Sequence, residues 1–144
     1  MIDIFHDFDM KMPSRRPKVL VQTAAHVSGA AYYYRPNNIS NQESNKKLIG
    51  VCIHPKYGGW FAIRGVIIFR NILTPNLKKN EPERMISISE VENELLYKFN
   101  YEWQDGSYRD VIPVIKRYSE LQTKYFSLKP SERMSLIKEI FTSI

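Results

Sequence analysis

The chain contains very little cysteine and histidine. Cys52 is the single cysteine among 144 residues, so no disulfide can form within the chain. The three histidines, His6, His26 and His54, are too widely spaced for a zinc site of the cysteine–histidine type. We therefore expect no metal site built from the protein's own side chains, so that any metal would enter inside a cofactor. The scarcity of cysteine also favours a reducing, cytoplasmic location.

Other signals of function are absent as well. No apolar run approaches the roughly 18 residues that a membrane span requires, and residues 1–9 lack the order of a signal peptide. The sequence has no glycine-rich phosphate loop, no nucleophile elbow and no paired-carboxylate motif. These absences predict that the protein does not enter a membrane, and they exclude the enzyme classes that such motifs mark.

The composition is that of a globular domain. Hydrophobic residues make up 43% of the sequence and charged residues 25%, which predicts one domain over residues 1–144. The net charge is +6, but the basic residues are spread along the chain rather than gathered in one arm. This spread argues against nucleic-acid binding and favours individual arginines that act locally.

The first half of the chain reads as one helix and several strands. Residues 1–12 predict an irregular segment or a short edge strand, and Pro17 is placed in the first turn of a helix that ends at Ser28 and Gly29. Residues 30–35, with three consecutive tyrosines, predict a strand, and residues 36–47 a loop.

The clearest local pattern predicts a β-hairpin. Two β-rich runs, residues 48–54 and 60–70, flank a short connection that contains Gly58 and Gly59. On the second predicted strand, Arg64 interrupts an otherwise apolar face. The predicted fold class is α+β, with a central antiparallel hairpin flanked by helices.

Three helices are predicted in the second half of the chain. Ser87 and Ser89, each followed three residues later by a glutamate, indicate a capping box for a helix that runs towards Tyr97. Pro113 and Pro130 each open a further helix. The apolar stripe of the last helix is expected to be buried, and it comprises Ile137, Ile140, Phe141 and Ile144.

Most candidate functional side chains have a structural interpretation that we prefer from the pattern alone. His26 and His54 are expected to pack or cap rather than to act as ligands or bases. Cys52 is expected to be a small buried hydrophobe in a pocket wall rather than a redox thiol. For residues 32–34 we expect core packing ahead of stacking on a nucleic acid.

Three arginines leave two interpretations open. Arg64, Arg109 and Arg133 can pair with neighbouring carboxylates, for which Asp105, Asp110 and Glu132 are the candidates. Alternatively, they can converge on the carboxylates of a ligand, which the forked guanidinium matches bidentately. Spacing alone favours pairing within the protein.

Several blocks of the sequence, taken in order, closely resemble the methylmalonic aciduria and homocystinuria type C family of cobalamin trafficking proteins. The blocks are RRPK (15–18), QTAAHV (22–27), GAAYYY (29–34), GVCIHP (50–55), GGWFAIRG (58–65), YRD (108–110) and RYSE (117–120). The resemblance implies a fold similar to flavin-dependent nitroreductases. It covers only the C-terminal part of the family domain, so we expect an incomplete domain, from a truncated form, a short isoform or a fragment.

The resemblance also implies an activity. Family members bind cobalamin with its lower base detached from cobalt and then remove the upper ligand. Cyanide leaves reductively, with electrons from a reduced flavin, FAD or FMN, that NADPH keeps reduced. Alkyl groups leave by transfer to glutathione. Implied partners are the type D protein of the same disorder and the methionine synthase machinery, and the chain is expected as a monomer or homodimer. The alternatives are a non-catalytic cobalamin carrier or adaptor, and an inactive truncated form.

Site residues are carried over by motif. The resemblance implies that Arg64, Arg109 and Arg133 bind the carboxylates of glutathione, which reverses the ranking from spacing alone. No side chain is expected to act as a catalytic acid or base. The implied cobalamin contacts are Asp7, Val19, Leu20, Val21, Gln22, Tyr33, Tyr34, Arg35, Cys52 and Ile63.

Overall fold

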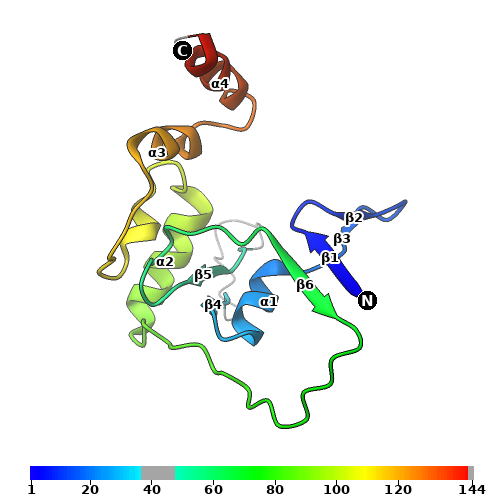
Figure 1. Cartoon of the computed structure of the whole chain (residues 1–144). Helices are drawn as coiled ribbons and strands as arrows, with labels where there is room; N and C mark the ends of the chain where they lie inside the picture. The colour runs from blue at the N-terminus through cyan, green and yellow to red at the C-terminus, as the bar shows by residue number, and fades with distance from the viewer. Residues whose placement is uncertain (37–47, 143–144) are drawn as a thin grey trace.

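The computed structural model describes residues 1–36 and 48–142 and has an α+β architecture (Figure 1). The loop predicted over residues 36–47 lies, apart from Pro36, outside the described residues. Within the described residues, three two-stranded antiparallel sheets form: β1 (Ile2–His6) with β6 (Gly65–Phe69), β2 (Met10–Lys11) with β3 (Arg16–Pro17), and β4 (Tyr32–Tyr34) with β5 (Val51–Ile53). The helical elements are α1 (Val21–Val27), α2 (Ser89–Tyr101), the 3-10 helix η1 (Ser107–Asp110), α3 (Glu120–Ser127) and α4 (Arg133–Thr142). The predicted α+β class is confirmed.

The predicted central hairpin is wrong. A tight turn does form, because His54 and Gly58 exchange both backbone hydrogen bonds at 2.9 Å. Beyond this turn the two runs separate: β5 pairs with β4, and β6 pairs with β1. Residues 60–64 form no regular strand. Pairing partners distant in sequence therefore replaced the local partner that the pattern indicated.

The main core lies between the β4–β5 pair and α2. Tyr34, Ile53, Leu95 and Leu96 are its most completely buried large side chains. The Tyr34 hydroxyl accepts a hydrogen bond from the Ile86 backbone N–H at 2.8 Å, which satisfies a polar group inside the core. This arrangement fixes β5 and therefore the position of Cys52 beside α1.

Two predicted helix starts differ from the observed ones. Pro17 lies in β3, where it pairs with Met10, and α1 begins only at Val21. The helix predicted towards Tyr97 is present as α2, but neither capping box forms, because its N-cap is Ile88 and makes no side-chain bond. Glu92 instead pairs with Arg84 at 2.8 Å, so its carboxylate is engaged outside the helix terminus.

The helix predicted to open at Pro113 is also wrong. Residues 111–119 are not helical, and the Ile115 N–H donates to the Lys56 carbonyl at 3.0 Å, which ties this segment to the turn before Gly58. α3 begins instead at Glu120, behind a complete capping box in which Ser119 and Gln122 exchange side-chain-to-backbone bonds.

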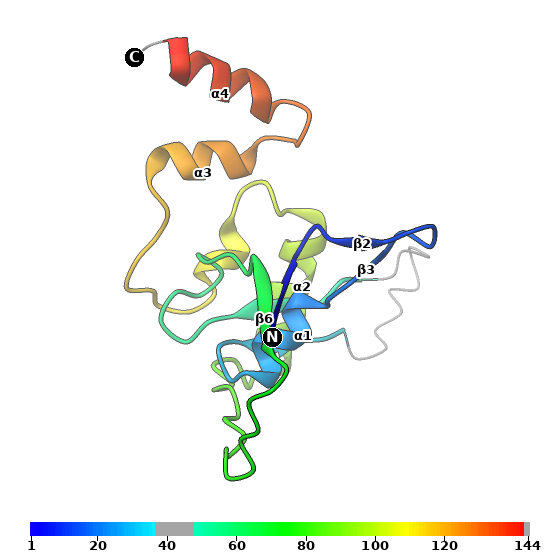
Figure 2. The ribbon, with the colours of Figure 1, turned by 45° about the vertical axis from the view of Figure 1, so that its right-hand side comes forward.

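α3 and α4 lie together at one end of the molecule, away from the β1–β6 pair (Figure 1), and the second view shows the same separation (Figure 2). The last helix is present as predicted, although it begins at Arg133 rather than at Pro130, and its apolar stripe is not buried throughout. Ile137 and Ile140 are half-buried, whereas Phe141 is 74% exposed. Ile144 lies outside the described residues.

Candidate ligand-binding site

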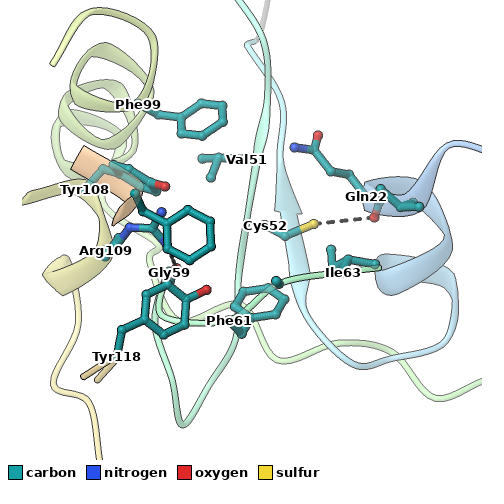
Figure 3. A pocket seen from close by; sticks show the side chains of 13 residues that line it. Gln22, Val51, Cys52, Gly59, Phe61, Ile63, Phe99, Tyr108, Arg109 and Tyr118 are labelled. Atoms are coloured by element: carbon teal, nitrogen blue, oxygen red, sulfur yellow. Dashed lines mark hydrogen bonds between the residues drawn. The ribbon is translucent and has the colours of Figure 1, made fainter. Parts of the chain in front are cut away.

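A cavity of about 220 Å³, here called the first cavity, lies between α1, β5, η1 and α3 (Figure 3). In Figure 3, Gln22, Cys52 and Ile63 line one side, and Tyr108, Arg109 and Tyr118 line the other. Among the described lining residues there is no histidine and no carboxylate. The full lining is Val21, Gln22, Val51, Cys52, Gly59, Phe61, Ala62, Ile63, Phe99, Tyr108, Arg109, Tyr118 and Phe126.

Cys52 gives this cavity an inert sulfur. The thiol is buried and lies 3.4 Å from the Gln22 carbonyl oxygen, to which it donates. Burial raises the pKa of Cys52 from 9.0 to about 12, because the thiolate would lose its hydration. The side chain therefore stays a neutral thiol at physiological pH, as expected for a packed residue rather than a redox or metal-ligating one.

Arg109 is the one cation that lines the first cavity in the described part of the chain. Its guanidinium donates to the Gly59 carbonyl. It forms no ion pair with any carboxylate of residues 1–36 or 48–142. It also lies over the four aromatic rings of Trp60, Tyr108, Tyr118 and Phe126, here called the ring cluster. The distances from its Cζ to the ring centroids are 5.4 Å for Trp60, 4.9 Å for Tyr108, 5.3 Å for Tyr118 and 5.9 Å for Phe126.

Two glycines allow η1 to lie against the turn. A Cβ on Gly58 would come within 2.4 Å of the Arg109 carbonyl oxygen, and one on Gly59 within 2.9 Å of the Arg109 Cα. The Gly59 N–H donates to the Arg109 carbonyl at 3.0 Å, so the two residues are bonded in both directions. Close backbone approach, in addition to the turn, explains the glycine pair.

A second cavity of about 470 Å³ shares residues 61–63 with the first, because these residues line both. Arg64 lines this second cavity and is paired with Asp7 at 2.8 Å. The Asp7 N–H also donates to the Arg64 carbonyl at 3.0 Å. The second carboxylate oxygen of Asp7, Oδ1, is buried and has no hydrogen-bond partner among the described residues.

The structure thus separates Arg64 from Arg109, whereas it brings Arg133 near Arg109. The Arg133 Cζ lies 5.7 Å from the Phe126 ring, which also contacts Arg109. Arg133 donates from Nε to the Leu128 carbonyl at 3.2 Å. The pairing predicted from spacing alone is wrong for all three arginines. Arg64 pairs with Asp7, and neither Arg109 nor Arg133 forms an ion pair with a carboxylate of the described residues.

The predicted cobalamin contacts are divided between the cavities and the core. Val21, Gln22, Cys52 and Ile63 line the first cavity, and Ile63 lines the second as well. The remaining predicted contacts line neither. Among them, Tyr34 is fully buried, and Tyr33 packs against the cluster that contains Cys52. The Arg35 guanidinium lies over the Tyr33 ring, 5.2 Å from its centroid. Val19 and Leu20 lie just before α1, and Asp7 follows β1.

The two histidines near the cavities have structural contacts. Nδ1 of His26 accepts from the Tyr33 N–H at 3.2 Å, and its ring meets Tyr32 edge-on. Nδ1 of His54 accepts from the Lys56 N–H at 3.0 Å. Burial and the nearby Lys56 charge lower the pKa of His54, which keeps its ring neutral. Both side chains pack and accept hydrogen bonds, as predicted.

Two other kinds of feature are absent from the part of the chain that the structure describes. No group of three histidine, cysteine, aspartate or glutamate side chains there could hold a metal ion. None of the helices in residues 1–36 and 48–142 has the length and apolar character needed to cross a bilayer.

Sequence reasoning missed the residues that hold Arg109. Trp60 and Phe126 contact its guanidinium, yet they come from segments far apart in sequence. Asp110, which the spacing predicts as a candidate partner for an arginine, also contacts Trp60. The one available signal was the density of aromatic residues around Arg109, with Tyr108 beside it and Tyr118 nine positions later.

Comparisons with known proteins give a consistent result. The model of the methylmalonic aciduria and homocystinuria type C family matches residues 1–137. A cyanocobalamin reductase / alkylcobalamin dealkylase of Gallus gallus is 52% identical over 94% of this chain and 57% of its own length. The one of Homo sapiens is 44% identical over 94% and 48%, respectively. The chain therefore spans about half the length of these curated relatives.

A solved structure matches as well. The crystal structure of a B12-trafficking protein from C. elegans, described as a homologue of the human type C protein, superposes with a TM-score of 0.84. Its sequence identity is 39%, and the match covers 95% of this chain and 55% of that one. The fold of the matched region is thus shared with a solved relative.

Proposed function

The chain belongs to the methylmalonic aciduria and homocystinuria type C family, and from this membership we propose that it takes part in cobalamin processing: it binds cobalamin with the lower base detached and removes the upper axial ligand. The observation that carries the proposal is the first cavity, which gathers Val21, Gln22, Cys52 and Ile63 beside an arginine that has no carboxylate partner in the described residues. Residues 61–63 line both this cavity and the second one.

The side chains of the first cavity suit a cobalt complex whose lower ligand has been removed. Its described lining offers no imidazole, and its one thiol is held neutral by a pKa of about 12. Neither group therefore competes for the vacated position on cobalt. A cobalt centre with one donor fewer is easier to reduce, because less electron density stabilises its higher oxidation state.

Dealkylation is proposed to proceed by transfer to glutathione. The thiolate sulfur attacks the carbon bonded to cobalt, the new S–C bond forms as the C–Co bond breaks, and both electrons of that bond remain on cobalt. The products are a thioether and cob(I)alamin. The protein is proposed to contribute by holding the thiolate in line with the carbon, and the described lining of the first cavity offers no histidine or carboxylate for acid–base catalysis.

Arg109 is the residue best placed to hold a glutathione carboxylate, because it lines the first cavity and no carboxylate of the described residues neutralises its charge. Arg133 is proposed to bind a second carboxylate from the other side of Phe126. Arg64 is proposed as a third contact, and it must leave Asp7 to serve. Among the proposed cobalamin contacts, Tyr34 could reach the ligand only through its backbone, because its side chain is fully buried.

Removal of cyanide is proposed to be reductive: cobalt accepts electrons and cyanide leaves with its own electron pair. A reduced flavin, FAD or FMN maintained by NADPH, is the proposed electron donor. A nitroreductase-like fold for the longer family protein, a cytoplasmic location, and partnership with the type D protein and the methionine synthase machinery are proposed on the same family grounds.

A non-catalytic cobalamin carrier, or an inactive short form, is the competing proposal, since the chain spans about half of its curated relatives. Incubation of the purified 144-residue chain with methylcobalamin and glutathione separates the two. An enzyme forms cob(I)alamin and the methyl thioether of glutathione in equal amounts, and Arg109→Ala slows this reaction. A carrier binds methylcobalamin and releases it unchanged.

A further inference from the structure

Asp110 makes two contacts that determine the surroundings of Arg109. Its Oδ1 accepts a hydrogen bond from Trp60 Nε1 at 2.7 Å and one from Arg117 Nε at 2.9 Å. Both donors converge on the same oxygen. Because Trp60 belongs to the ring cluster, Asp110 fixes the position of one of the rings over which Arg109 lies.

The same contacts explain why Arg109 has no carboxylate partner in the described chain. Asp110 is the next residue along the chain, but its carboxylate is paired with Arg117, and Trp60 donates to the same oxygen. A guanidinium has five N–H donors, and the hydrogen bond observed for Arg109 goes to the Gly59 carbonyl. Further donors therefore stay available to an incoming carboxylate.

We propose that Asp110 and Arg117 are positioning residues for ligand binding. Asp110 holds the Trp60 indole against Arg109, and Arg117 neutralises the Asp110 carboxylate so that it does not repel the carboxylate of the ligand. This inference rests on the proposed function, because it takes glutathione as the ligand of Arg109. It assigns a role to two exposed side chains that line neither cavity.

The proposal distinguishes two neighbouring cations. Arg117 contacts Asp110, whereas the adjacent Lys116 is exposed, and both carry one positive charge. Loss of Arg117 leaves the Asp110 carboxylate uncompensated beside Arg109, where it either pairs with that guanidinium or repels an anion. Loss of Lys116 removes the same charge without changing Asp110.

The test is a calorimetric titration of the 144-residue chain with glutathione. We expect Arg117→Ala to weaken binding about fivefold and Lys116→Ala by less than about twofold, in line with the difference between a charge-assisted bond and an isolated surface charge. Equal affinities for the two variants would overturn the proposal. Failure of the wild-type chain to bind glutathione would instead contradict the proposed function and, with it, the premise of this inference.

A second readout reports the geometry independently of the ligand. The chain has two tryptophans, so its indole N–H signals in a nitrogen–proton correlation spectrum can be assigned with Trp60→Phe. We expect Asp110→Leu to move the Trp60 signal and to weaken glutathione binding about fivefold. Asp110→Asn retains an oxygen acceptor and should restore most of both. An unmoved Trp60 signal in the folded Asp110→Leu variant would overturn the positioning role.

Discussion

The two arginines that line the two cavities, Arg109 in the first and Arg64 in the second, have opposite electrostatic surroundings. Arg109 lies over the ring cluster with no carboxylate partner in the described chain, whereas Arg64 is paired with Asp7. Aromatic rings hold a guanidinium in place without neutralising it, but a carboxylate occupies the donors that a ligand would need. The comparison indicates that Arg109 is prepared to bind an anion and that Arg64 must first be released.

The largest effects are expected from glycines that touch each region. A Cβ at Gly59 would meet the Arg109 Cα at 2.9 Å, and one at Gly65 would meet the Phe5 carbonyl oxygen at 2.5 Å. Each alanine variant should lose about 1 to 3 kcal/mol of stability in thermal unfolding, because backbone must move. Gly59→Ala should also weaken glutathione binding by up to about tenfold, and Gly65→Ala about twofold, because only the change at Gly59 displaces Arg109. Comparable losses of glutathione binding would remove the distinction between the two regions.

Replacement of the arginines themselves tests the comparison next. Arg109→Ala should weaken glutathione binding about tenfold, as expected for the loss of a charge-assisted bond, and Arg64→Ala about threefold. Cobalamin binding, followed by its visible spectrum, should change little in either variant. A larger loss from Arg64→Ala than from Arg109→Ala would show that the paired arginine carries the anion site.

Release of Arg64 should have a smaller effect of opposite sign. Asp7→Asn removes the charge that competes for Arg64, whose side chain is 69% exposed. Exposed ion pairs contribute about 0.2 to 1 kcal/mol, so glutathione should bind about two- to threefold more tightly. Asp9→Asn is a matched control, because Asp9 accepts from the His6 N–H and does not contact Arg64. Weaker binding in Asp7→Asn would mean that Asp7 supports Arg64 instead of competing for it.

Ionisation of Cys52 gives the smallest effect, since it arises only in alkali. The pKa of the buried thiol is raised from 9.0 to about 12. The contribution of the neutral thiol to the free energy of unfolding is therefore fully present below pH 9 and is lost as pH rises towards 12. By pH 9.5 the free energy of unfolding should have fallen by about 0.8 kcal/mol more in the wild type than in Cys52→Ala. Denaturant unfolding at pH 7.5 and 9.5 measures this difference; parallel declines would show that the thiol is not shielded from water.

Local patterns predicted elements better than they predicted pairing. The strand of consecutive tyrosines, the apolar run around Cys52, and the helices now seen as α1, α2 and α4 all follow from spacing and side-chain type. The hairpin failed because the partner of β6 is β1, more than fifty residues away, and no local pattern encodes that contact. The missed start of α3 had a signal, Ser119 followed by Gln122, that Pro113 obscured.

The candidate site could be predicted only in part, for a related reason. Resemblance pointed to Gln22, Cys52, Ile63 and Arg109, which the fold brings around one cavity. It could not indicate that Arg64 would be occupied by Asp7, because that contact requires the β1–β6 pairing that brings residue 7 to residue 64.

The most direct test of the account is the visible spectrum of cyanocobalamin mixed with an excess of the purified chain. We predict a shift to the form in which the lower base is detached from cobalt. Ile63 lines both cavities, so Ile63→Trp should fill space in each and abolish the shift. Ile67 is exposed and lines only the second cavity, so Ile67→Trp should preserve the shift. An unchanged spectrum with the wild-type chain in excess would contradict the assignment of this site to cobalamin.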